Sequence, residues 1–158
     1  MRRFLLVGIG VLALAVPVSA FALRAAPNDG TLSVSAGRGT FVINGKGGVI
    51  GSFTRGRVII NDPIPDDGTG PIVSGEDWTK VRNATTTTYG GTKVRFRDIG
   101  GTFRIRVIAV GVNLSVVGRD QVTLKGAGTV NDGMYSVNGD PDLPVPALIE
   151  FTLNASTP

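Results

Sequence analysis

Apolar and polar residues alternate along most of the chain after residue 30, in short runs that are separated by glycine pairs. Between residues 93 and 107, Val94, Phe96, Ile105 and Val107 alternate with charged residues. A period of two predicts β-strands with one buried face. We expect strands at residues 31–35, 39–44, 48–53, 57–61, 78–82, 93–98, 102–110, 113–117, 121–125, 134–138 and 147–153.

The segments between these runs contain Gly-Gly, Asn-Gly and Asp-Gly pairs, among them Asn44-Gly45, Gly100-Gly101 and Asp132-Gly133. Such pairs accept the positive φ angles of tight hairpin turns. The pattern therefore predicts an all-β domain, an antiparallel β-sandwich or barrel built of meander hairpins. Residues 48–60 and 111–124 share a strand, Gly/Arg turn and strand pattern, which leaves a short β-solenoid as the alternative.

Composition supports the all-β prediction. The chain is rich in Val, Ile and Thr, whose branched side chains favour strands over helices. Glu76, Glu150 and Gln121 are the only residues of their types, so the straight-chain helix formers are scarce. No stretch combines an apolar period of 3.6 with a capping box. A length of 158 residues favours one domain.

The N-terminus has the three parts of a secretory signal peptide, which are basic residues at Arg2 and Arg3, an apolar run, and small residues near 18–22. We expect a signal-peptide helix over residues 1–22, cleaved after Ala20 or Ala22. A single domain over residues 23–153 and a frayed tail over 154–158 would follow. This predicts a secreted or cell-envelope protein. An uncleaved N-terminal anchor is the alternative, because residues 4–23 are uncharged and long enough to span a bilayer.

The formal net charge of +4 includes Arg2 and Arg3, so the excess of positive charge in the mature part is two. That balance is too weak to predict a nucleic-acid partner. No membrane contact is expected after signal cleavage.

Arginines are concentrated on one side of a predicted hairpin. If Gly100-Gly101 forms a two-residue turn, Phe96 faces Ile105, and the basic residues share the opposite face. We expect a candidate anion-binding face there, made of Lys93, Arg95, Arg97, Arg104 and Arg106. The planar guanidinium group suits carboxylate, phosphate and sulfate, so an anionic cell-wall polymer or an acidic glycan is the expected partner. An ordinary solvated face is the alternative.

Two weaker candidates lie in loops. Asp62, Asp66 and Asp67 could supply oxygen ligands to Ca²⁺, although Asp-Pro and Asp-Gly are also plain turn chemistry. No other cofactor is expected. Trp78 and Tyr89 follow loops and could contact a ligand, although aromatic residues in a small β-domain more often pack against its core.

The chain has no His and no Cys. This excludes Ser-His-Asp and Cys-His catalysis, zinc sites of the usual kind and disulfides. No nucleophile elbow or phosphate-binding loop occurs. We expect an exported non-enzymatic β-domain with a structural or adhesive role and no catalytic residues. The alternatives are a small carbohydrate-active enzyme that uses Asp and Glu, and a β-barrel carrier of a small apolar ligand.

Three segments carry a resemblance. They are Gly-Arg-Gly-Thr-Phe-Val at 37–42, Tyr-Gly-Gly at 89–91 with Arg95-Phe96-Arg97, and Gly-Val-Asn-Leu-Ser-Val-Val-Gly-Arg at 111–119. In these segments the chain resembles secreted β-rich proteins of high-GC Gram-positive bacteria, over roughly residues 31–153. The resemblance implies export and a bacterial envelope setting. It implies no activity and no site residues.

Overall fold

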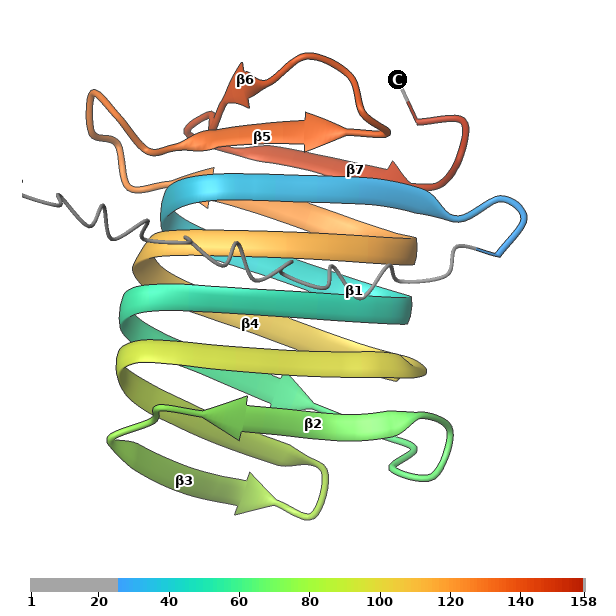
Figure 1. The fold of residues 1–158 in the computed structure, drawn as a ribbon, viewed down its shortest axis with the longest axis vertical. Helices are drawn as coiled ribbons and strands as arrows, with labels where there is room; N and C mark the ends of the chain where they lie inside the picture. The colour runs from blue at the N-terminus through green and yellow to red at the C-terminus, as the bar shows by residue number, and fades with distance from the viewer. Residues whose placement is uncertain (1–25, 158) are drawn as a thin grey trace, which may run out of the picture.

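The structure, a computed structural model, describes residues 26–157, and its regular structure there is entirely β-strand (Figure 1). Two long strands dominate the fold, β1 (Gly30–Asn61) and β4 (Thr86–Gly126). The shorter strands are β2 (Thr69–Ser74), β3 (Trp78–Asn83), β5 (Met134–Val137), β6 (Leu143–Pro144) and β7 (Ile149–Leu153).

The predicted signal peptide, residues 1–22, lies outside the described residues. Within residues 26–157 we find no helix with the length and hydropathy needed to cross a membrane.

Strands β1 and β4 are antiparallel and pair with each other in two registers at once. Phe41 of β1, for example, lies between Val107 and Leu124 of β4. Each strand can have the other on both of its sides because the pair winds into a coil. Each turn of β1 therefore lies between two successive turns of β4. Figure 1 shows the two strands alternating along the stack. The antiparallel all-β class is confirmed, and the sheet is open.

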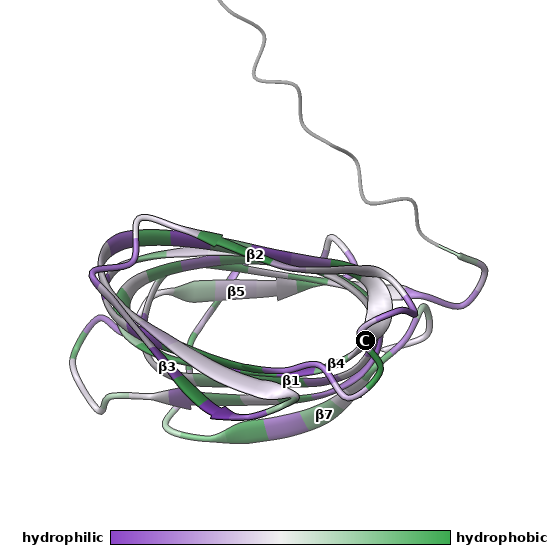
Figure 2. Ribbon diagram, turned by 90° about the horizontal axis from the view of Figure 1, so that it is seen from below, coloured by the Kyte–Doolittle hydropathy of each residue, from purple (hydrophilic) through white to green (hydrophobic). Residues whose placement is uncertain are grey.

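The coil is flattened into two walls, which Figure 2 shows end on. We call wall A the wall that contains β2, β5 and β6 together with the β1 and β4 segments between them. Wall B contains β3 and β7 and the segments of β1 and β4 that lie between these two strands. The long strands pass from one wall to the other at two corners. Wall A and wall B therefore present their outer surfaces in opposite directions.

The predicted meander of hairpins is wrong, because the neighbours in the sheet come from distant parts of the chain. Gly100 and Gly101 form no hairpin turn and lie inside β4. Gly47 pairs with Gly101 and Gly48 pairs with Ile99, so Gly100, with a φ of 90°, is the extra residue of a β-bulge. Glycine suits such a bulge because it has no Cβ to oppose a positive φ.

The space between the walls is filled by side chains. Phe41, Phe53 and Phe103 are at most 2% exposed and pack with inward Val, Ile and Leu residues. Gly51 leaves room for two of these side chains, because a Cβ there would overlap the ring of Phe96 and come within 2.7 Å of Leu114. The interior is thus a packed core, and the candidate binding surfaces lie on the outside.

Candidate anion-binding site

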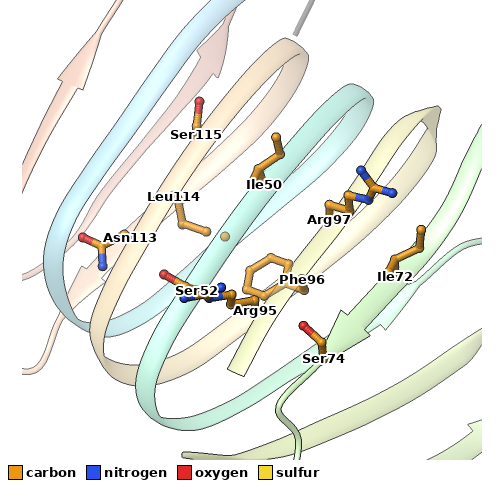
Figure 3. Close-up of a pocket in the computed structure, with 11 residues that line it drawn as sticks. Ile50, Ser52, Ile72, Ser74, Arg95, Phe96, Arg97, Asn113, Leu114 and Ser115 are labelled. Carbon is orange, nitrogen blue, oxygen red and sulfur yellow. The ribbon is translucent and has the colours of Figure 1, made fainter. Parts of the chain in front are cut away.

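A groove of about 520 Å³ crosses the outer surface of wall A (Figure 3). It covers four neighbouring strand segments, in the order β2, β4, β1 and the next turn of β4. With about 4.8 Å between neighbouring strands, these segments span about 14 Å. This length is suited to more than one unit of a polymer.

Two rows of outward side chains line the groove. The first row runs through Ile72, Arg97, Ile50 and Ser115. The second row runs through Ser74, Arg95, Ser52 and Asn113. One arginine therefore stands between two isoleucines and the other between two serines, as Figure 3 shows. Both arginines are exposed, so their guanidinium groups are open to a ligand.

A second hollow, of about 380 Å³, continues the groove toward one corner of the coil. It shares Ser52, Ser74, Arg95 and Asn113 with the first hollow and adds Lys93. Lys93 has a φ of 59°, the left-handed region that a residue with a Cβ enters at a cost of about 1–3 kcal/mol. Lys93, Arg95 and Arg97 of the predicted anion-binding set thus line one continuous groove.

The positive charge of this groove is not neutralised within the described part of the chain. No Asp or Glu is among its lining residues. The one ion pair in residues 26–157 joins Arg119 to Asp29 at 3.6 Å, and neither residue lines the groove. An anion in the groove would therefore meet cations and hydroxyl groups without competing carboxylates.

The other two predicted anion-binding residues lie on wall B. Arg104 pairs with Asn44 and Asn61, and Arg106 lies two residues further along β4 on the same face. The corner at Gly100 and Gly101 separates them from Arg95 and Arg97. The five cations do not form the single face that the hairpin predicted, because β4 continues around the corner instead of turning back.

Trp78 and Tyr89 do not share a surface. Trp78 pairs with Gly90 and is 47% exposed on the outside of wall B. Tyr89 pairs with the buried Val58 and packs against the core. Trp78 alone remains available to a ligand.

The acidic loop is held by its own hydrogen bonds. Asp62 accepts one from the Ile64 amide at 3.2 Å, and Asp67 accepts one from the Thr102 amide at 2.9 Å. Asp66 is exposed. Over residues 26–157, no three carboxylates are grouped so as to hold a metal ion. Asp67 therefore ties the loop to the corner of the coil, Asp62 braces the loop internally, and the three aspartates are not grouped as a calcium site would require.

Two buried carboxylates were not singled out from the sequence. Asp98 and Asp120 are 3% and 2% exposed. Burial raises the pKa of Asp98 to about 6, with Asp62 and Asp67 adding to the rise, and raises the pKa of Asp120 to about 7, with Asp29 adding. The alternation of residue types indicates that Asp98 is buried, because it follows Val94 and Phe96 in the inward positions of the strand.

The two glutamates are far apart in the fold. Glu76 lies between β2 and β3 at one end of the stack, and Glu150 lies in β7 at the other end (Figure 1). A cleft with paired carboxylates, which the enzyme alternative requires, is not formed by this pair.

A scan against models of known protein families and searches of curated proteins and of solved structures found no match.

Proposed function

We propose that this protein is an exported, non-enzymatic β-domain that binds an anionic polymer of the cell envelope or extracellular space through the groove on wall A. The single observation that carries the proposal is the continuous groove lined by Lys93, Arg95 and Arg97, which contains no carboxylate. Its role is structural or adhesive.

The lining chemistry fits an acidic glycan or a sugar-phosphate polymer. Guanidinium groups bind carboxylate, sulfate and phosphate with two parallel hydrogen bonds. The Ser52 and Ser74 hydroxyls and the Asn113 amide can donate to or accept from sugar hydroxyls beside them. The isoleucine row offers apolar contact to the ring carbons. A polymer satisfies all three kinds of group at once, whereas a single small anion satisfies one.

Binding to heparin, a sulfated glycan, tests the proposal. We expect R95Q/R97Q to weaken binding at least tenfold at low salt. Each contact between a cation and an anionic group contributes about one unit to the dependence of log K on log salt, so the slope should fall by about two. The matched control is K46Q/R119Q, which removes the same charge at the other corner and should stay within about twofold of the wild type.

A second variant tests whether the polar lining of the groove contributes to binding in addition to its charge. S74A/N113A keeps every charge and removes two polar groups from the lining. We expect it to weaken heparin binding while leaving the salt slope unchanged. If R95Q/R97Q binds heparin as the wild type does, the groove is not the polymer site.

Export is part of this proposal and has its own test. Expression of the full chain in a bacterial host should release a mature form whose N-terminal sequence begins at Phe21 or Leu23. Recovery of the protein with Met1 still attached would contradict cleavage.

A further inference from the structure

Wall B carries a second concentration of positive charge, on the side of the molecule opposite to the groove. Its exposed cations are Arg57, Lys80, Arg82, Arg104, Arg106 and Lys125. Among the outward residues of the strands described on this wall, Glu150 is the one acid, and it lies on the edge strand β7 beside Thr123. The wall is therefore basic over most of its height.

The cations are close enough to repel one another. Arg104 and Arg106 are neighbours on one face of β4, about 7 Å apart along the strand. Arg57 pairs with Ile108, which places it diagonally across from Arg106 at about 7–8 Å. Like charges at these distances repel one another. A bound polyanion would remove this repulsion.

A groove of about 710 Å³ extends this surface toward the corner of the coil. Three cations line it, namely Arg38, Arg55 and Lys125. Gly39, Gly56 and Gly126 also line it and leave the backbone uncovered by side chains. The groove is wide and basic, as an extended anionic chain requires.

Trp78 adds a flat apolar surface to the lower part of wall B. Its indole covers Gly90, and Arg57 is the next residue across the sheet from Gly90. An aromatic face beside a guanidinium group suits an acidic sugar, since the ring carbons can stack on the indole while the acid group meets the arginine.

The two basic surfaces lie on opposite walls (Figure 2). They face in opposite directions, and both hollows reach the same corner of the coil, where Thr54 and Gly111 line the wall A hollow and Arg55 and Val110 line the wall B groove. Two carboxylates flank this corner. Asp77 accepts a hydrogen bond from the Thr92 amide at 3.0 Å beside Lys93. Asp132 is held as a carboxylate near Arg38, because hydrogen bonds from Thr129 and Gly128 and the charge of Arg38 lower its pKa. A single strand that served both walls would have to bend around this corner.

We infer that wall B is a second, independent surface for an acidic glycan, and that the domain cross-links two polymer strands. The cross-linking rests on the proposed function of wall A, while the wall B surface stands by itself.

The first experiment measures stoichiometry by calorimetry with a heparin-derived tetrasaccharide. We expect two tetrasaccharides per wild-type protein and one for R104Q/R106Q or for R95Q/R97Q. Trp78 is the only tryptophan, so its fluorescence reports on wall B. The fluorescence change on binding should persist in R95Q/R97Q and disappear in R104Q/R106Q.

The second experiment uses full-length heparin. The wild type and the control K46Q/R119Q should produce turbidity through cross-linking, and each single-wall variant should bind without producing it. All substituted side chains are exposed, and equal melting temperatures would confirm that the variants fold.

The outcomes separate the two proposals. If R104Q/R106Q still binds two tetrasaccharides, the wall B inference is wrong and the wall A groove stands. If R95Q/R97Q still binds two tetrasaccharides while R104Q/R106Q binds one, the wall A proposal fails and the wall B inference stands. One tetrasaccharide per protein, lost in either variant, would overturn cross-linking, because it indicates one strand that contacts both walls.

Discussion

The indole of Trp78 occupies the space that a side chain at Gly90 would fill, across the pairing of β3 with β4. A Cβ on Gly90 would overlap the six-membered ring of the indole and lie 2.8 Å from Nε1. An aromatic side chain that packs over a glycine of the neighbouring strand supplies the side-chain contact that the glycine itself cannot make. This packing also holds the only tryptophan flat on the outside of wall B.

Replacing Gly90 with alanine should displace the indole. We expect G90A to lower the free energy of unfolding by about 1–3 kcal/mol through overpacking, and to shift the Trp78 fluorescence to longer wavelength as the ring becomes solvated. Urea denaturation followed by fluorescence measures both. G70A is the control, because the nearest atoms to a Cβ at Gly70 lie at 3.7 Å. Equal effects of the two substitutions would contradict the described packing.

A pair of engineered cysteines can test the coil directly. Arg97 pairs with Ile50 in the structure, whereas a hairpin at Gly100-Gly101 would pair it with Arg104. Directly paired strand residues are close enough for a disulfide, which needs Cα atoms about 4.4–6.8 Å apart. I50C/R97C should therefore oxidise within one molecule, as non-reducing electrophoresis after proteolysis will show. R97C/R104C should remain reduced, and its ready oxidation would contradict the continuous β4.

The buried carboxyl of Asp120 makes stability depend on pH. Neither of its oxygens has a hydrogen-bond partner, and burial raises its pKa to about 7. An unfolded aspartate loses its proton near about pH 4, so the stability due to Asp120 is fully present below that pH. It is lost as the pH rises toward 7, by at most about 1.4 kcal/mol per unit.

Asp120→Asn should flatten this dependence and raise the melting temperature at pH 8. Thermal unfolding between pH 4 and pH 8 is the measurement. Asp98→Asn is the comparison, since the pKa of Asp98 is raised to about 6 and its effect should end at a lower pH. An unchanged slope in Asp120→Asn would show that this carboxyl is not the titrating group.

The pKa of Asp132 is lowered, so its contribution to stability depends on pH in the opposite sense to that of Asp120. The Asp132 carboxylate accepts hydrogen bonds from the Thr129 hydroxyl and from the Gly128 and Thr129 amides, which lowers its pKa. The stability due to Asp132 is therefore present at neutral pH and lost in acid. Asp132→Ala should lower the melting temperature at pH 7 and have a smaller effect at pH 3. Asp142→Ala, at an exposed position, should change little at either pH.

The alternation of residue types determined which side chains face the core. Val94, Phe96, Ile105 and Val107 are all buried, as their spacing predicts. A pleated strand turns successive side chains to opposite faces whatever its partner is, so this prediction needs no knowledge of the partner. The same rule correctly placed Arg95, Arg97, Arg104 and Arg106 on the outside.

The partners themselves were decided only by the tertiary structure. The inward positions change parity between Asp98 and Gly101, and the sequence pattern favoured a two-residue hairpin turn as the cause. In the structure the cause is the one-residue bulge at Gly100, after which β4 continues around the corner. A hairpin turn and a bulge shift the alternation in the same way, but one reverses the chain and the other does not. For that physical reason the sequence determined the strands and their outer faces, while the coiling of β1 with β4 divided the arginines between two walls.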